Sequence, residues 1–152
     1  MKMVLQRVRE ASVEVDGRIA GKIGRGICLL IGVEKGDTDA DAETLARKAV
    51  ELRIFPDALG RMNLSLAEAG GQVLAISQFT LAGSTRKGRR PSFDNAEEPK
   101  RAVDLFNLAV ERMRGLGFRV ETGVFQALMN VSLINEGPVT FILDSRPPGV
   151  NR

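Results

Sequence analysis

Two short segments place polar side chains directly beside apolar runs, where they could do chemistry. Residues 77–80, Ser-Gln-Phe-Thr, follow the apolar run 73–76, and residues 135–138, Asn-Glu-Gly-Pro, lie between two apolar segments near the C-terminus. Polar side chains at the end of a buried strand need hydrogen-bond partners or serve a function. We therefore expect the two segments to be the halves of one site.

The composition limits what chemistry this site can do. The chain contains no histidine, tyrosine or tryptophan. It therefore has no Ser-His-Asp or Cys-His nucleophile system and no histidine metal site. Ser77 and Thr80 are either weak nucleophiles or strand side chains that bond locally. Oriented backbone N–H groups at a strand end are the alternative, because one such donor lowers the barrier to an oxyanion by about 3–4 kcal/mol.

The Gly137-Pro138 pair permits two interpretations. Most such pairs form an ordinary turn with a trans bond, and only about 5–6 % of X-Pro bonds in folded proteins are cis. A cis bond would fix the neighbouring carbonyls rigidly, so that they could bind an ammonium group and exclude a misplaced side chain. Arg7 lies in the middle of an apolar, alternating segment, so it either extends to solvent or is paired with acceptors.

A basic loop follows the first segment, with four positive charges within residues 86–90. It is either a solvated surface run or a rim that binds phosphates, and its closeness to residues 77–80 favours the second interpretation. The net charge of +3 is too small to decide the question. Met129 and Phe125 are more typical of a core than of a base-stacking platform, although Met129 is kept as a candidate RNA contact.

The remaining composition is that of one ordinary globular domain, which we expect at residues 1–144, before a disordered tail at 145–152. Apolar residues make up 43 % of the 152 residues and charged residues 27 %. No run approaches the roughly 20 apolar residues of a membrane helix, and no signal peptide opens the chain, so we expect a cytoplasmic protein. The single cysteine, Cys28, excludes an internal disulfide and is expected to be a buried hydrophobe. We expect no metal and no cofactor.

Hydrophobic periodicity predicts more strands than helices. Residues 3–15 and 18–23 should form a hairpin around Asp16-Gly17, and residues 72–81 a strand buried on both faces. Helices are expected at 38–52 and from Pro99, the second with a capping box formed by Asn95 and Glu98. Further strands are expected at 27–33, 53–55, 63–66, 118–122, 131–134 and 139–143. This order favours an α+β fold whose mainly antiparallel sheet is curved or barrel-like and carries two amphipathic helices.

The two polar segments resemble the signatures of a known family, the D-aminoacyl-tRNA deacylases. The first is Ser-Gln-Phe-Thr-Leu at 77–81 and the second is Asn-Glu-Gly-Pro-Val-Thr at 135–140. Segments 5–8, 32–34, 53–55 and 87–93 are also similar, in the same order along the chain. Two separate signatures in the correct order are specific, whereas either one alone would be weak.

The resemblance implies a cytoplasmic homodimer that hydrolyses the ester between a D-amino acid and the terminal adenosine of tRNA. It also implies activity on glycine mischarged onto alanine tRNA. The pair Gly137-Pro138 is then expected to be cis and to enter the partner subunit's pocket, where its carbonyls bind the α-amino group and exclude an L side chain. Arg7 is expected to hold this pair in place.

The resemblance leaves two mechanisms open for the residues around Thr80. Either Thr80 is a nucleophile, or the ribose hydroxyl of the substrate assists an attacking water while N–H groups near Phe79 and Thr80 stabilise the oxyanion. The absence of histidine favours the second. The assignments are then catalytic Ser77, Gln78, Phe79 and Thr80; substrate-binding Arg7, Asn135, Gly137 and Pro138; and RNA-binding Arg86, Lys87, Arg89, Arg90 and Met129. The alternatives are a deacylase mainly for glycine, a non-catalytic RNA-binding module and a purely structural homodimer.

Overall fold

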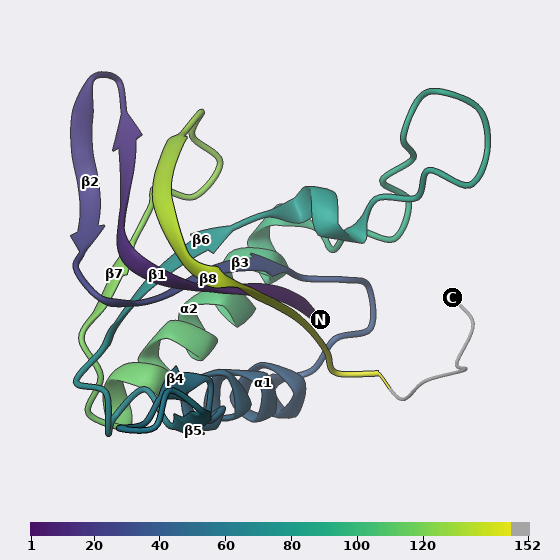
Figure 1. Cartoon of the computed structure of the whole chain (residues 1–152). Helices are drawn as coiled ribbons and strands as arrows, with labels where there is room; N and C mark the ends of the chain where they lie inside the picture. The colour runs from purple at the N-terminus through teal and green to yellow at the C-terminus, as the bar shows by residue number, and fades with distance from the viewer. Residues whose placement is uncertain (147–152) are drawn as a thin grey trace.

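The structure is a computed structural model that describes residues 1–146 (Figure 1). The part of the expected tail from residue 147 onward lies outside the described residues. The first two residues of the expected tail, Ser145 and Arg146, contact the body of the protein. The Ser145 hydroxyl accepts a hydrogen bond from the Met1 amino group at 2.8 Å, and the Arg146 guanidinium donates to the Lys35 carbonyl at 2.6 Å.

The first strand organises the sheet. β1 (Lys2–Val15) pairs antiparallel with β3 (Gly26–Gly32) through its first half and with β2 (Arg18–Ile23) through its second half. β8 (Asn130–Asp144) follows the opposite edge of β1 along both halves. The predicted hairpin is confirmed, and Asp16 and Gly17 both have positive φ, as its tight turn requires.

The other part of the sheet is parallel. β6 (Gln72–Ser77) lies beside β3, and β7 (Val120–Thr122) lies beside β6, both in parallel register. The expectation of a mainly antiparallel sheet is therefore corrected to a mixed sheet. The reason is that each of these strands follows a helical crossover, which returns the chain in the same direction.

The sheet curls into a nearly closed, barrel-like shape, and two helices complete an α+β fold as expected. Gly21 of β2 packs against the backbone of Thr122 in β7, although the two strands stand at opposite ends of the strand order. Inside the curl lies a small apolar cluster that includes Cys28, which is 1 % exposed, as predicted for a buried hydrophobe.

The helices α1 (Asp39–Glu51) and α2 (Pro99–Gly115) pack together on one face of the sheet (Figure 1). Their apolar faces and the facing strands form the main core. Thr38 caps α1 in a capping box with Asp41. The capping box expected for α2 is wrong, because its N-cap is Glu98 without a side-chain cap, although Pro99 does open the helix.

A short antiparallel pair, β4 (Phe55–Pro56) and β5 (Met62–Leu64), extends the fold beside α1. Among residues 1–146, neither helix combines the length and apolar character that crossing a membrane requires.

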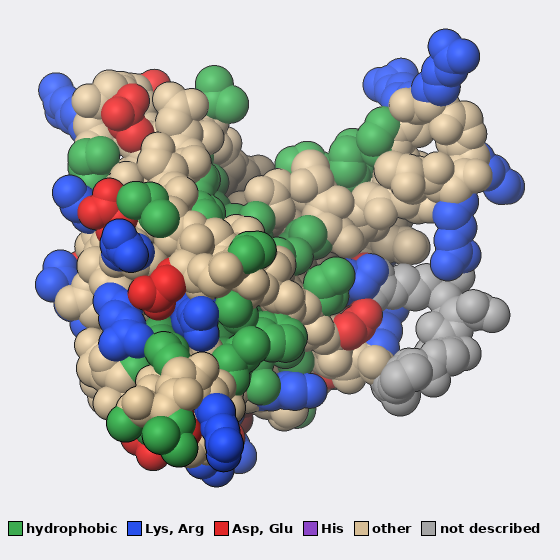
Figure 2. All heavy atoms as spheres, viewed as in Figure 1, with side chains coloured by type: hydrophobic (Ala, Val, Ile, Leu, Met, Phe, Trp, Pro, Cys, Tyr) green, Lys and Arg blue, Asp and Glu red, His purple; other side chains and the backbone are tan. Residues whose placement is uncertain are grey.

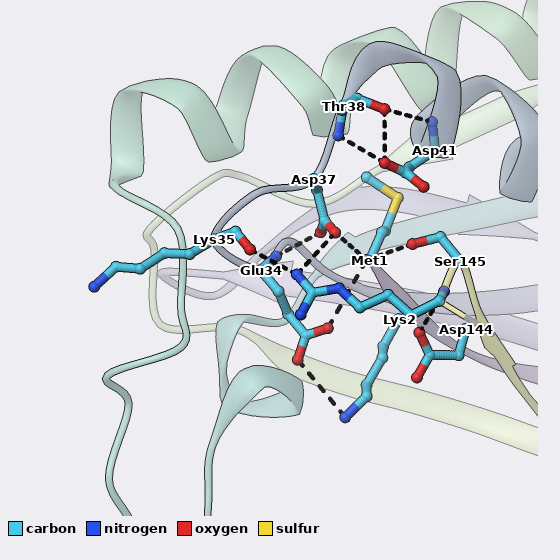
Figure 3. Close-up of polar contacts among 10 residues, drawn as sticks. Met1, Lys2, Glu34, Lys35, Asp37, Thr38, Asp41, Asp144 and Ser145 are labelled. Carbon is cyan, nitrogen blue, oxygen red and sulfur yellow. Dashed lines mark hydrogen bonds and ion pairs between the residues drawn. The ribbon is translucent and has the colours of Figure 1, made fainter. Parts of the chain in front are cut away.

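A polar cluster connects the two ends of the described chain (Figure 3). The Met1 amino group is buried, pairs with the Asp37 carboxylate and also donates to Ser145. The same carboxylate accepts a hydrogen bond from the Glu34 N–H at 2.7 Å. Burial lowers the pKa of the Met1 amino group and raises the pKa of Asp37. The cluster fixes the start of β1 against the segment between β3 and α1.

Candidate functional site

The polar run after β6 is a turn and not a continuing strand. β6 ends at Ser77, and η1 (Phe79–Ala82) is one turn of 3-10 helix. The prediction of a strand that continues to residue 81 is therefore wrong. The reason lies in the neighbouring strand: the Gln78 N–H still donates to the Ile31 carbonyl at 2.8 Å, but β3 ends at Gly32 and offers no further ladder partner.

Gly32 allows this turn to lie close to β3. A Cβ atom at Gly32 would stand 2.9 Å from the Gln78 carbonyl oxygen and 2.7 Å from the Leu81 Cβ. Both contacts are too short for any other residue without a shift of the turn. The end of β3 therefore determines where η1 lies.

Turn η1 exposes both a hydroxyl and backbone donors. Thr80 is exposed, and its hydroxyl accepts a hydrogen bond from the Gln78 side-chain amide at 2.5 Å. The first hydrogen bond of the turn joins the Leu81 N–H to the Gln78 carbonyl at 3.2 Å. The N–H groups of Phe79 and Thr80 come before this bond and therefore take no part in the hydrogen bonding of the turn. Oriented N–H groups of this kind can stabilise an oxyanion.

A cleft of about 520 Å³ opens beside the turn. This volume lies within the range of small-molecule sites. Of the residues assigned from the sequence, four line the cleft: Ser77, Gln78, Phe79 and Met129. Thr80 and the residues from Asn135 to Pro138 are not among the described residues that line it.

The far wall of the cleft comes from the start of α2 and from the loop before β8. Phe106 and Phe125 lie there with their ring centroids 6.4 Å apart, followed by Gln126 and Leu128. Of the residues on this wall, Met129 was a predicted RNA contact and Phe125 was expected in the core, whereas Phe106, Gln126 and Leu128 were not predicted. Gln126 has a φ of 63°, and a loop with such a backbone carries no periodic pattern that would reveal it.

The second polar segment leaves the sheet in an excursion from β8. In the β1–β8 ladder Gln6 pairs with Thr140 and Val8 with Asn135, so Arg7 alone stands opposite residues 136–139. The two strands predicted at 131–134 and 139–143 are therefore parts of one strand. The Gly137–Pro138 peptide bond is cis, and both residues are exposed.

Two side chains hold the base of this excursion. The Asn135 carboxamide accepts from the Val139 N–H at 2.8 Å and donates to the Val139 carbonyl at 3.3 Å, which closes the excursion as a backbone ladder would. Arg7 is 8 % exposed; its Nε donates to the Glu136 carbonyl at 2.9 Å, and its Nη1 donates to the Ile54 carbonyl. Of the two interpretations of Arg7, the paired one is correct.

A third group, missed from the sequence, lies beside these contacts. The Glu136 Oε2 atom is 3.7 Å from the Arg7 Nε and 3.9 Å from the Arg25 Nε. The Arg25 guanidinium also lies 5.4 Å from the ring centroid of Phe55. These residues come from four separate parts of the chain, so sequence spacing could not have connected them.

The basic loop projects from the body of the protein as an arm (Figure 1). An antiparallel bridge between Ser84 and Ser92 closes it, and the four cationic side chains between them are exposed. Figure 2 shows Lys and Arg side chains gathered at the end of this arm. In a single chain the structure thus separates three groups: the cleft, the excursion and the arm.

Comparison with known proteins identifies what this architecture belongs to. The sequence pattern of a family described as D-Tyr-tRNA(Tyr) deacylase matches residues 4–144. The chain belongs to this deacylase family. Membership makes it a hydrolase that acts on an ester bond.

Relatives in bacteria resemble this deacylase along nearly the whole chain. A D-aminoacyl-tRNA deacylase from Geotalea uraniireducens is 58 % identical over 145 residues, covering 95 % of this chain and 94 % of the relative. A D-aminoacyl-tRNA deacylase from Geobacter sulfurreducens is 58 % identical over 146 residues, 96 % of each chain.

Two solved structures share the fold of this deacylase. A protein described as a c-Myc DNA unwinding element binding protein has a TM-score of 0.90 at 38 % identity, covering 97 % of this chain and 100 % of its own. A probable eukaryotic D-amino acid tRNA deacylase has a TM-score of 0.81 at 18 % identity, covering 93 % of this chain and 97 % of its own. The second similarity concerns the fold alone.

Proposed function

We propose that this protein hydrolyses the ester between a D-amino acid and the terminal adenosine of tRNA, releasing the free amino acid and tRNA. The observation that carries the proposal is the cleft lined by Ser77, Gln78 and Phe79, next to the N–H groups of Phe79 and Thr80, which precede the first hydrogen bond of η1. The names of the bacterial relatives agree with this substrate class. We place the activity in the cytoplasm and in a single domain, residues 1–144.

In the proposed mechanism the protein supplies position and oxyanion stabilisation, and the substrate assists its own cleavage. Water attacks the ester carbonyl carbon, and the neighbouring ribose hydroxyl relays its proton. The N–H groups of Phe79 and Thr80 bind the oxyanion until the ester C–O bond breaks and the ribose oxygen takes the proton. Two observations support this route: the chain has no histidine, and the partner of the Thr80 hydroxyl is an amide, which is not a base.

The cleft holds the terminal nucleoside, with Met129 and Phe125 on its wall. The arm, through Arg86, Lys87, Arg89 and Arg90, contacts phosphates and so positions the RNA without reading its bases. The exposure of all four side chains supports this role.

Chiral selection requires a second copy of the chain in our proposal. Gly137 and Pro138 are exposed and lie outside the cleft of their own chain, so they enter the partner's cleft, where their carbonyls bind the α-amino group. Arg7 and Asn135 hold them in place. Exposed apolar side chains on the same strand suit contact with a second copy: Val131, Ile134, Phe141 and Ile142.

Exclusion of an L side chain by a backbone wall needs no favourable contact with the D side chain. The enzyme should therefore accept many D-amino acids, and glycine on alanine tRNA as well.

A deacylation assay with matched D- and L-tyrosyl-tRNA tests the proposal. We expect D-ester hydrolysis to exceed L-ester hydrolysis by about a hundredfold or more in kcat/KM, which corresponds to about 2.7 kcal/mol of transition-state discrimination. Glycyl-tRNA should be hydrolysed as well. Binding of tRNA without cleavage would instead identify an RNA-binding module, and neither binding nor cleavage a structural homodimer.

A further inference from the structure

Two phenylalanine rings lie in contact outside the core. The ring centroids of Phe79 and Phe93 are 5.0 Å apart with an interplanar angle of 58°. The two residues are 59 % and 39 % exposed, whereas Phe55 and Phe106 are buried. In such a tilted pair each ring keeps open area for another flat group, so the exposed pair can receive a ligand.

The pair connects the cleft to the basic arm. Phe79 lines the cleft and is exposed, and Phe93 directly follows the bridge that closes the arm. The Phe93 ring is fixed against Gly83, where an added Cβ would stand 2.9 Å from its Cε1 atom. Figure 2 shows hydrophobic side chains along the neck of the arm, between the body and the Lys and Arg side chains at its end.

A nucleic acid whose last nucleoside occupies the cleft can leave it past Phe79, which lines the cleft and is 59 % exposed. The cleft volume of about 520 Å³ suits one nucleoside with its ester, so the preceding nucleotides run outward along the neck of the arm. Exposed aromatic rings beside cationic side chains are the arrangement by which proteins hold single-stranded nucleic acid. The four like charges of the arm also disfavour the arm of a second copy at this surface.

We propose that Phe79 and Phe93 form a stacking platform for the unpaired cytidines that precede the terminal adenosine of tRNA. The inference rests on the proposed function, because it takes the terminal nucleoside to lie in the cleft. The platform binds bases through their faces and the arm binds the phosphates between them, so recognition here is independent of the amino acid.

A binding experiment tests the platform without any catalytic step. The natural chain contains no tryptophan, so the variant Phe93→Trp carries a single fluorescent reporter. We expect a short RNA ending in cytidine-cytidine-adenosine to quench this fluorescence by stacking, with weaker quenching at high salt, and adenosine alone to leave it unchanged. The matched control is Phe118→Trp, at a half-buried phenylalanine on the main core, which should show no quenching. No quenching at position 93, or equal quenching at both positions, would overturn the proposal.

A kinetic experiment tests whether the platform contributes to turnover. Phe93→Leu should raise KM for D-aminoacyl-tRNA about 5- to 150-fold with kcat unchanged, since stacking of one base contributes about 1–3 kcal/mol. Hydrolysis of D-aminoacyl-adenosine, which lacks the cytidines, should be unaffected by Phe93→Leu. The variant Phe93→Tyr, which keeps an aromatic ring, should have the KM of the natural protein for D-aminoacyl-tRNA. An equal loss of activity on both substrates would indicate that Phe93→Leu displaces η1. Unchanged kinetics on both substrates would show that Phe93 does not stack on the RNA. Either result overturns the inference.

The two experiments also separate this inference from the proposed function. A wild-type protein that cleaves neither substrate would refute the deacylase proposal, while the quenching titration would still decide whether the platform binds RNA. Melting temperatures of all variants, including Phe93→Tyr, identify any that fail to fold.

Discussion

The hydroxyl of Thr80 accepts its hydrogen bond from the side-chain amide of Gln78, which cannot take up a proton from it. At the scale of single residues, this contact favours a positioning role for Thr80 over covalent chemistry. A nucleophile needs a base or a lowered pKa, and neither is supplied by an amide.

We therefore predict that Thr80→Ala lowers kcat by less than about tenfold, whereas loss of a true nucleophile costs 10⁴-fold or more. Single-turnover deacylation of D-tyrosyl-tRNA measures the effect, with Thr44→Ala, at an exposed threonine of α1, as the matched control. An acyl group trapped on Thr80 from native substrate would contradict the mechanism.

Cys28 provides a second prediction at this scale. Burial raises the pKa of its thiol from 9.0 to about 12, so the folded protein keeps it protonated at neutral pH. We expect a disulfide reagent at pH 8 to label the thiol only after unfolding in guanidinium.

The same shift makes stability depend on pH in the alkaline range. The unfolded thiol ionises above about 9 while the folded thiol retains its proton, so the free energy of unfolding should fall as pH rises from 9 toward 12. Denaturant titrations at several pH values measure this fall, and Cys28→Ala should remove the part that belongs to the thiol. Rapid reaction of Cys28 with the disulfide reagent in the folded protein would contradict the burial of this thiol.

At the scale of elements, the end of β3 determines where the turn η1 lies. Gly32→Ala would place a Cβ against the Gln78 carbonyl and Leu81, which forces η1 away from β3. We expect kcat/KM to fall about a hundredfold, as for a misplacement of about 1 Å, with a loss of about 1–3 kcal/mol in unfolding free energy. The matched control is Gly24→Ala, where an added Cβ meets no atom within 4 Å. Unchanged activity in Gly32→Ala would mean that the turn does not carry the oxyanion donors.

At the scale of the whole molecule, the separation of cleft and excursion in one chain leads to a complementation test. We take one variant defective in the cleft, Gly32→Ala, and one defective in the excursion, Arg7→Ala. If the excursion acts across a dimer, each mixed dimer contains one intact site, built from the wild-type half of each chain.

Mixing the two defective variants under conditions of subunit exchange should therefore raise the rate to about one quarter of the wild-type rate, since about half of the dimers are mixed and each mixed dimer has one intact site of two. The deacylation rate of D-tyrosyl-tRNA measures the recovery. Each variant alone, exchanged with itself, is the control. Absence of recovery would show that the excursion serves its own chain.

Local patterns in the sequence determined the β1–β2 hairpin, both helices, the buried strand β6 and the buried Cys28. They also drew attention to both polar segments. These features follow from periodicity and turn chemistry, which depend on the backbone within a few residues. Only the tertiary structure decided that β3 pairs in parallel with β6 and that β6 ends at Ser77. It also decided that Arg7 lies opposite the excursion. It alone brought Phe125 to the wall of the cleft and Phe93 against Phe79. Each of these depends on which distant segment supplies the next hydrogen-bond or packing partner, and no local pattern in the sequence carries that information.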